Sequence, residues 1–465
     1  MGNLTKAQEN LRKSVDKCKF WDKKNKNEAV ENKGENKLRK CKSYEGNSYK
    51  LLGNLSVSKG NLQKAEEIYY ESLKIYESLY GENHSDVATS LNNLGHLHCL
   101  QGIFPKSKTF FLKSLEIYQN LFGEKHFSIA TSYNNLGGLY KNMGDYQKAE
   151  QFYQKSLKIR QDLFGENHSS VATSLNNLGD LYKAMEDYVK TVDFYTKSLK
   201  IREGLFGENH SDVADSLNNL GGLYVKLQNW PKAEEVYLKS LRIYQKLFGD
   251  NHISVATSFN NLGQVYKNLK DISKAEELYI KSLKINQSLF DENHVSHATS
   301  YNNLGCLYIM SGDLSKAMEY FLKCLNVRQN LFGENDASVA STLANLAYLY
   351  EKKGEMLKAE ENYMKSLKIR EKIFDDNHQD LASSLNDLAN LYKNLGEWKK
   401  AEEFYLKALK IHLNVFGKNH SMVENSYNYL GSLFKKMGEQ KKAEAFYHKS
   451  SKIRQNMHFR KSLPY

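Results

Sequence analysis

Three observations in the sequence predict an all-α solenoid built from ten helical hairpins. Apolar residues recur three and four positions apart in two stretches of every unit, which places an apolar stripe along each of two helices. Only 3 of the 465 residues are proline, so helices are rarely interrupted. The pattern also has a period of 42 residues without insertion or deletion, which is typical of arrays whose units are stable only when stacked. The period is clearest in a Leu-Gly dipeptide that returns at Leu94-Gly95, Leu136-Gly137, Leu178-Gly179, Leu220-Gly221, Leu262-Gly263, Leu304-Gly305 and Leu430-Gly431.

One unit, residues 129–170, shows how each hairpin is expected to form. Its first helix, helix A, begins near Ile129, and its second and longer helix, helix B, begins at Tyr146 and ends before Gly165. Gly165 follows the last apolar residue, where glycine most readily closes a helix in a left-handed conformation. The polar segment Asn167-His168-Ser169 supplies groups that can cap the start of the next helix A.

Gly137 lies inside helix A, where glycine costs about 1 kcal/mol relative to alanine. A close approach of helix B would compensate for this cost. We expect the small residue Ala149 to face Gly137, with Tyr140 and Tyr153 filling the space around the contact. Two units carry alanine in place of this glycine, at Ala347 and Ala389.

The ten units occupy residues 46–465 and follow a basic segment, residues 1–45. The formal net charge of the chain is +12, and half of it lies in this segment, which holds 13 Lys or Arg and 7 Asp or Glu. Residues 4–21 carry a helical apolar stripe on a lysine-rich background. This stripe fits a capping helix docked on the first unit, a helix for a partner or a membrane surface, or a loosely ordered head. Residues 22–42 are expected to be a flexible tether.

The composition argues against several classes of protein. The five cysteines are scattered without metal-ligand spacing, so we expect no disulfide framework, no metal, no cofactor and a reducing cytoplasmic location. No apolar run approaches the length of a transmembrane segment. No phosphate-binding loop occurs, and candidate catalytic residues recur with the repeat rather than forming one cluster, so we expect no enzyme and no catalytic residues. Near-uniform units cannot read a base sequence, so nucleic acid is not an expected partner.

The residues Leu136-Gly137, Tyr140, Ala149 and Tyr153 match the tetratricopeptide signature. The unit length and the phrases LNNLG, KAE, SLKIR and LFGENH resemble the long repeat of the kinesin light chain family over residues 46–465. The resemblance implies a right-handed superhelix in which helix A residues line a concave groove. It also implies peptide cargo, a kinesin motor chain as a partner and association with microtubules. The heptad region through which light chains bind the motor heavy chain has no match in this sequence.

A pair of asparagines recurs on helix A, as in Asn134-Asn135. An amide both donates and accepts, so a row of amides can hold the main chain of an extended peptide whatever its side chains. In tetratricopeptide domains the second asparagine often clamps the ligand backbone, and the resemblance gives this role to Asn93, Asn135, Asn177, Asn219, Asn261, Asn303 and Asn345. The sequence leaves an alternative open, in which the amides bond to one another across the repeat junction as an internal ladder.

Lysines recur further along helix A, at Lys141, Lys183, Lys267, Lys393 and Lys435. If they face the groove, an acidic peptide is the favoured ligand, as the resemblance to kinesin light chains also implies. If they do not, they are solvated side chains that interact favourably with the C-terminal end of the helix dipole. Because the asparagines are nearly uniform, ligand selectivity would have to come from helix A positions that vary, such as His96, Gly138, Asp180, Gly222, Gln264, Cys306, Tyr348 and Asn390.

The sequence therefore predicts a non-enzymatic adaptor or scaffold that binds extended, acidic peptide segments in the manner of a kinesin light chain. The alternative is a regulatory or sensor subunit that controls a catalytic partner on another chain. Histidines also recur once per unit, but they lie in turns one whole unit apart, so we interpret them as turn residues rather than metal ligands.

Overall fold

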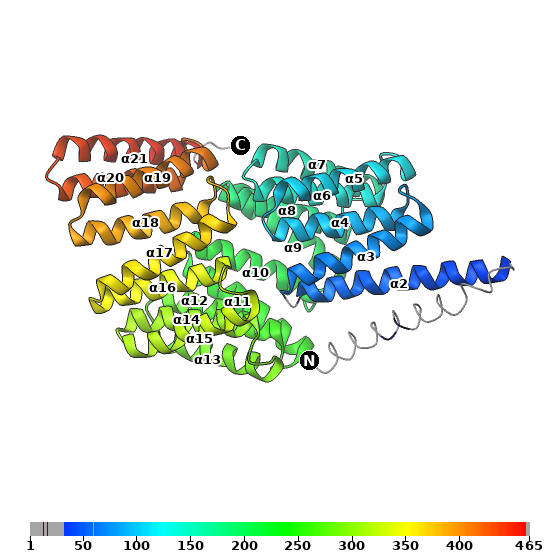
Figure 1. The fold of residues 1–465 in the computed structure, drawn as a ribbon, viewed down its shortest axis with the longest axis horizontal. Coiled ribbons are helices and arrows are strands. Elements are labelled where there is room, and N and C mark those ends of the chain that lie inside the picture. The colour runs from blue at the N-terminus through cyan, green and yellow to red at the C-terminus, as the bar shows by residue number, and fades with distance from the viewer. Residues whose placement is uncertain (1–12, 14–15, 17–31, 59, 462–465) are drawn as a thin grey trace. The chain divides into compact units, whose positions relative to one another are not determined.

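The structure, a computed structural model, describes residue 13, residue 16, residues 32–58 and residues 60–461. All regular structure in this part of the chain is helical, and its twenty helices follow one another as ten hairpins (Figure 1). The prediction of an all-α solenoid of ten hairpins is confirmed. The expected helix at residues 4–21 lies outside the described residues apart from two single positions, so its three interpretations stay open.

The hairpins alternate a helix A with a helix B. The A helices are α2 (Asn32–Ser58), α4 (Ser85–Leu100), α6 (Phe127–Asn142), α8 (Ser169–Ala184), α10 (Ser211–Lys226), α12 (Ile253–Asn268), α14 (Val295–Ser311), α16 (Ala337–Lys353), α18 (Gln379–Leu395) and α20 (Ser421–Lys436). The B helices are α3 (Leu62–Tyr80), α5 (Phe104–Phe122), α7 (Tyr146–Phe164), α9 (Tyr188–Phe206), α11 (Trp230–Phe248), α13 (Ile272–Leu289), α15 (Leu314–Phe332), α17 (Met356–Ile373), α19 (Trp398–Phe416) and α21 (Gln440–Lys461). The expected tether at residues 22–42 is wrong from Asn32 onwards, because the first helix A already begins there.

The helices form two compact units, Met1–Leu247 and Phe248–Tyr465. Inside each unit, the two helices of a hairpin pack together, and each helix B also packs against the next helix A, as α7 does against α8. Consecutive A helices touch as well, α4 with α6 and α6 with α8 in the first unit, and α14 with α16 and α16 with α18 in the second. Side chains at equivalent positions of neighbouring A helices are therefore brought into one row.

In eight of the ten hairpins, a glycine of helix A meets an aromatic ring of helix B at the centre of the hairpin. A Cβ atom added to Gly137 would lie 2.6 Å from Cδ1 of Tyr153, closer than van der Waals contact allows. The atoms nearest to this position belong to the Tyr153 ring, which the sequence placed around the contact, and Ala149 is fully buried. In the preceding repeat Ser107, the equivalent of Ala149, donates to the carbonyl oxygen of Gly95 at 2.7 Å, so this helix B position does lie beside the glycine. The same contact recurs between Gly53 and Tyr69, Gly95 and Phe111, Gly179 and Tyr195, Gly221 and Tyr237, Gly263 and Tyr279, Gly305 and Phe321, and Gly431 and Tyr447.

In some hairpins, a buried serine of helix B adds a hydrogen bond to the backbone of helix A. The hydroxyl of Ser114 donates to the carbonyl oxygen of Ala88 at 2.7 Å, and Ser198 donates to Ala172 at 2.8 Å. A buried hydroxyl is costly unless it is hydrogen-bonded. These bonds satisfy the serines and fix how far helix B is rotated relative to helix A.

The recurring histidines cap the A helices. In His168 the Nδ1 atom accepts a hydrogen bond from the backbone N–H of Ser170 at 3.2 Å, and the ring stacks on Phe164 with centroids 4.5 Å apart. The same cap occurs at His84, His126, His210, His252, His294, His378 and His420. Asp336 replaces the histidine at α16 and accepts from Ser338 N–H instead. The interpretation of these histidines as turn residues is confirmed.

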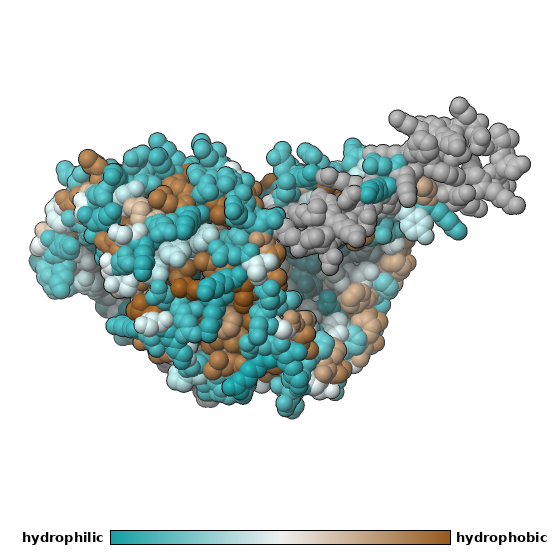
Figure 2. Space-filling model, turned by 90° about the horizontal axis from the view of Figure 1, so that it is seen from below, coloured by the Kyte–Doolittle hydropathy of each residue, from teal (hydrophilic) through white to brown (hydrophobic). Residues whose placement is uncertain are grey.

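The surface mixes hydrophilic and hydrophobic side chains, and the face in Figure 2 shows hydrophobic patches separated by hydrophilic ones. Some of the exposed apolar side chains come in pairs at the ends of B helices, as at Leu163 and Phe164, each 41% exposed. No helix among the described residues has the length and apolar character that crossing a membrane requires.

The tight glycine contact predicts opposite effects for two adjacent substitutions in α6. Gly137→Ala forces a methyl group into the Tyr153 ring, whereas a Cβ atom at Gly138 would lie 3.5 Å from the Tyr153 hydroxyl, an ordinary contact. We expect Gly138→Ala to raise stability by about 1 kcal/mol through helix propensity. Gly137→Ala should be less stable than Gly138→Ala by about 1–3 kcal/mol, the usual cost of overpacking.

Thermal and urea unfolding followed by far-ultraviolet circular dichroism would measure both variants. Equal stability of the two alanine variants would show that the ring yields without cost and would contradict the packing argument.

Candidate functional site

The asparagine pairs of the A helices lie on one face, which we call the helix A face. It is made of the half-buried and exposed side chains of helix A, as Thr257, Asn261, Gln264 and Lys267 are in α12. In the repeats that carry it, the glycine contact fixes the rotation of helix A relative to helix B and so determines which side chains lie on this face. Equivalent residues of consecutive A helices then follow one another along the face within each unit.

The asparagines are linked across the repeat junctions. The second asparagine donates through Nδ2 to Oδ1 of the first asparagine in the preceding repeat, in the pairs Asn135–Asn92 (3.4 Å), Asn177–Asn134 (2.7 Å), Asn219–Asn176 (2.8 Å), Asn303–Asn260 (3.4 Å) and Asn345–Asn302 (2.7 Å). These asparagines, together with Asn93 and Asn261, are half-buried. The internal ladder therefore exists, and the peptide-binding role of the second asparagine stays a prediction.

The structure places several of the predicted lysines on the helix A face. Lys267 lines a cavity there, and Lys183 Nζ lies 4.0 Å from where a Cβ atom of Gly222 would be. Lys393 donates to Asn390 Oδ1 at 3.1 Å and lies over the ring of Tyr405. Lys141, Lys183, Lys267 and Lys393 are all half-buried, whereas Lys435 is exposed.

The helix B tyrosine that packs on the central glycine also reaches the variable positions of helix A. The hydroxyl of Tyr405 donates to Asn390 at 2.6 Å, and the hydroxyl of Tyr195 donates to Asp180. Burial raises the pKa of both phenols, so each remains a donor over the physiological range. The side chain at the variable position therefore decides whether a buried phenol is already paired or points to the face unpaired.

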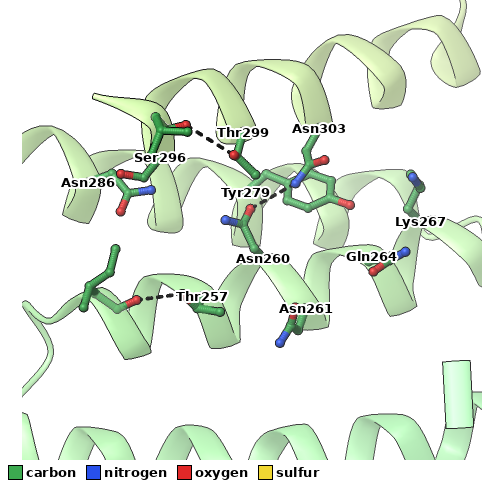
Figure 3. A pocket seen from close by; sticks show the side chains of 12 residues that line it. Thr257, Asn260, Asn261, Gln264, Lys267, Tyr279, Asn286, Ser296, Thr299 and Asn303 are labelled. Atoms are coloured by element: carbon green, nitrogen blue, oxygen red, sulfur yellow. Dashed lines mark hydrogen bonds between the residues drawn. The ribbon is translucent and has the colours of Figure 1, made fainter. Parts of the chain in front are cut away.

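The cavity on the helix A face lies between α12 and α14 in the second unit and has a volume of about 390 Å³ (Figure 3). Its wall from α12 includes Thr257, Asn260 and Lys267, and its wall from α14 includes Ser296, Thr299 and Asn303. Asn286 of α13 and Tyr279 form the rest of the lining from helix B. Three of the predicted site residues, Asn261, Asn303 and Lys267, are thus brought together at one cavity.

One helix B position that sequence reasoning missed links helix B to the helix A that follows it. Arg160 of α7 is 5% exposed, and its Nη1 donates to Ser170 O at 3.0 Å and to Ser174 Oγ at 2.9 Å, both in α8. The same two bonds are made by Arg202, Arg328 and Arg370. Other repeats carry Tyr76, Tyr118, Tyr244, Asn286 and His412 at this position. The signal in the sequence was one position of the 42-residue repeat that always carries a large polar side chain but varies in which one.

The asparagine ladder is interrupted in the second unit. Ala344 stands where the first asparagine would accept, and Asp387 stands where the second would donate, so this junction has no amide bond. Burial raises the pKa of Asp387 to about 6, an effect that Arg370 opposes and Glu351 reinforces. Glu351 itself occupies the position at which other repeats carry the predicted lysines. The helix A face therefore changes from basic to acidic at this junction.

Two further cavities lie away from this face, between consecutive B helices. One, of about 730 Å³, is lined by residues of α7, α8 and α9 that include Leu157, Leu175 and Gly204, and the other, of about 420 Å³, is at the equivalent place between α13 and α15. No group of three or more His, Cys, Asp or Glu side chains in the described part of the chain is arranged to hold a metal ion.

The buried carboxyl at the broken junction makes stability depend on pH. Because the folded-state pKa of Asp387 (about 6) lies above that of a free aspartate, its contribution is full at low pH and is lost as the pH rises through about 6. Asp387→Asn removes this loss, so we expect the variant to be more stable than the wild type by about 1–2 kcal/mol at neutral pH and equally stable near pH 4. Adding Ala344→Asn restores a ladder pair and should contribute about 1 kcal/mol more.

Urea denaturation at a series of pH values would measure these differences. A variant Asp387→Asn that is less stable than the wild type at neutral pH would mean that the carboxylate has a stabilising partner and that burial does not dominate.

The comparisons with known proteins agree with this geometry. The family model described as "Tetratricopeptide repeat" matches residues 44–120, 86–162, 128–204, 170–246, 212–285, 254–330, 338–413 and 380–456. No curated protein matches the chain.

Similar solved structures carry kinesin-light-chain and Rap names. BtubC (BKLC) from P. vanneervenii is 26% identical, with 50% of this chain and 90% of that chain covered and a TM-score of 0.40. A putative kinesin light chain from Podospora anserina with nearly identical TPR-like repeats is 20% identical, with 45% and 99% covered and a TM-score of 0.39. A Rap protein complexed with Competence and Sporulation Factor is 15% identical, with 81% and 99% covered and a TM-score of 0.51.

The family matches overlap along almost the whole run of hairpins, and the capped helices, the central glycine contact and the 42-residue period recur in the matched segments. The recognition of this repeat in the sequence is thereby confirmed. The chain belongs to the tetratricopeptide repeat family.

Proposed function

We propose that the chain is a non-enzymatic adaptor or scaffold that binds extended peptide segments along the helix A face. The observation that carries this proposal is that the second asparagines have hydrogen-bonding groups that the ladder does not use. In Asn177, for example, the ladder uses one hydrogen of the amide, while Oδ1 accepts no hydrogen bond in the described contacts and the side chain is half-buried rather than sealed. Each such amide still offers one donor and one acceptor, which is what the main chain of an extended peptide requires.

The ladder supports binding in a second way, because it holds each amide in place before a ligand arrives. A side chain that is already ordered loses less conformational entropy on binding. The ladder and the peptide-binding role, which are alternatives in the sequence, are compatible in this geometry. The ladder fixes the amide through one hydrogen, and the ligand takes the remaining groups.

Acidic segments are the ligands that we propose for the repeats carrying lysines. Lys141 and Lys183 in the first unit and Lys267 in the second are half-buried on the same face as the asparagines. A carboxylate of the ligand would gain charge-assisted hydrogen bonds there. The acidic pair Glu351 and Asp387 disfavours the same ligand at its own junction, so the preference belongs to the repeats before it.

A kinesin motor chain as the second partner, association with microtubules and a cytoplasmic location belong to the same proposal. They are supported by the likeness of the long repeat to kinesin light chains alone. A regulatory or sensor subunit is the alternative. Co-purification of the chain with a catalytic activity, competed by peptides that occupy the helix A face, would favour that alternative.

The asparagine proposal predicts a loss of binding without a loss of folding. Replacing Asn135, Asn177 and Asn219 together by alanine removes three amides of the first unit. We expect peptides selected on the wild-type chain from an extended-peptide array to bind at least about tenfold more weakly, because several main-chain hydrogen bonds are lost. The helix content measured by circular dichroism should stay nearly unchanged.

The matched control replaces the ladder acceptors Asn92, Asn134 and Asn176 by alanine and leaves the second asparagines in place. This control should bind the same peptides more tightly than the first variant does. Unchanged binding by the first variant, or unfolding in proportion to the loss of binding, would reduce the asparagines to an internal ladder.

The lysine proposal predicts a charge-specific effect. Lys141→Gln with Lys183→Gln should weaken binding of acidic peptides several-fold and reduce the effect of added salt, because screened charge pairs are removed. Lys148→Gln with Lys155→Gln, two exposed helix B lysines, makes the same change in net charge as a control. Calorimetric titrations at low and high salt would compare the two; equal effects of both pairs would place the lysines outside the binding site.

A further inference from the structure

The cavity between α12 and α14 coincides with the place that an arginine fills at other junctions. At the junction of α6 and α8, the guanidinium of Arg160 bonds to a carbonyl oxygen ten residues later and to a serine hydroxyl fourteen residues later, Ser170 and Ser174. Asn286 is the equivalent of Arg160, and the corresponding acceptors are Ser296 and Ser300 of α14. The two junctions therefore offer the same serine acceptors but are spanned by side chains of different length.

Asn286 is too short to occupy the whole of this space. Its Nδ2 donates to Ser300 Oγ at 3.2 Å, so it reproduces only one of the two bonds that Arg160 makes. Ser296, whose equivalent accepts the second bond at the other junction, instead lines the cavity. The volume of about 390 Å³ lies within the range of roughly 300–1,000 Å³ typical of ligand pockets and is ample for one side chain.

The floor of the cavity carries an unsatisfied acceptor. Asn286 is 1% exposed, it lines the cavity, and its Oδ1 has no hydrogen-bond partner in the described structure. A buried polar atom of this kind costs free energy unless a donor reaches it. Figure 3 shows the Asn286 amide beside Ser296, while Gln264 and Lys267 lie at the other end of the cavity.

We infer that this cavity binds the side chain of an arginine in the extended segment that lies along the helix A face. The ligand's guanidinium takes the place of the missing internal one and donates to Asn286 Oδ1 and to the Ser296 carbonyl. The rim, with Thr257, Val295 and Thr299 exposed, gives access from that face. The inference rests on the proposed peptide-binding function and adds an arginine to the segment that is bound.

The charge of the cavity opposes a cation only at the end away from Asn286. Lys267 is the only lining side chain that is charged at neutral pH, and it lies at the opposite end from Asn286 (Figure 3). Arg160 is held by a carbonyl and a hydroxyl alone, and burial lowers its pKa, so the repeat accommodates a guanidinium without a carboxylate partner. A planar guanidinium with several fixed donors fits two separated acceptors better than the point charge of a lysine does.

The direct test uses the full chain and a small probe, N-acetyl-arginine methylamide, with ligand-observed NMR and calorimetry as the measurements. We expect millimolar binding by the wild type, and binding of the uncharged citrulline derivative and of the lysine derivative at least about tenfold weaker. Asn286→Arg fills the cavity with an internal guanidinium and should abolish binding of the probe while raising the melting temperature. Asn286→Leu removes the acceptor without adding a guanidinium and should abolish binding as well.

The reciprocal variant moves the same site into the first unit. Arg160→Asn places an asparagine ten and fourteen residues before Ser170 and Ser174, the same spacing that Asn286 has to Ser296 and Ser300. It should lower the melting temperature, and the arginine derivative should recover part of this loss, as a small ligand can fill the cavity left by a truncated side chain. The citrulline derivative is the control and should recover less.

Probe binding that survives both Asn286→Arg and Asn286→Leu, or equal binding of the arginine and citrulline derivatives, would overturn the inference. These results do not bear on the proposed function itself. Peptides that lack arginine should still bind the Asn286→Arg variant and should still be lost in the triple Asn135, Asn177 and Asn219 variant. If peptides without arginine fail to bind the Asn286→Arg variant, or still bind the triple variant, peptide binding on the helix A face as a whole would be contradicted.

Discussion

The close contact between a helix A glycine and a helix B ring is the constraint on which the rest of the structure depends. Because Gly137 has no side chain, the Tyr153 ring lies against the backbone of α6, and this sets both the spacing and the rotation of the hairpin. The rotation determines that Asn134 and Asn135 lie on the helix A face. Repetition of the same geometry brings the amides of neighbouring A helices within 2.7 to 3.4 Å of each other, so the helix A face depends on a packing contact inside the hairpin.

The sequence predicted the framework of the repeat, although not every contact in it. The period of 42, the apolar spacing and the turn residues predicted the ten hairpins, and the glycine inside helix A predicted a close approach of helix B. The sequence pattern says which residues share a stripe but not how far helix B is rotated, so it did not predict that the Tyr153 ring lies closest to the glycine. The start of the first helix was also missed, since the residues after Asn32 lack the apolar signal that marks the other A helices.

The candidate site was predictable only in part, because much of it depends on departures from the repeat. The asparagines and lysines were found as recurring residues, and the structure places them on one face. The cavity depends instead on a single short side chain, Asn286, at a position where other repeats carry arginine, tyrosine or histidine, and the acidic junction depends on Glu351 and Asp387. The effect of such an exception can be judged only when the residues that surround it in the fold are known. The recurring residues form the scaffold, and the residues that depart from the repeat give individual junctions their own cavity or charge.

The histidine caps have a consequence for the array as a whole. Each cap requires an imidazole nitrogen that carries no proton, because that nitrogen accepts the N–H bond at the start of helix A. Stability in a stacked array is close to a sum over repeats and their interfaces. Because the same cap occurs at eight helix starts, its contribution to stability is repeated along the array instead of resting on one junction.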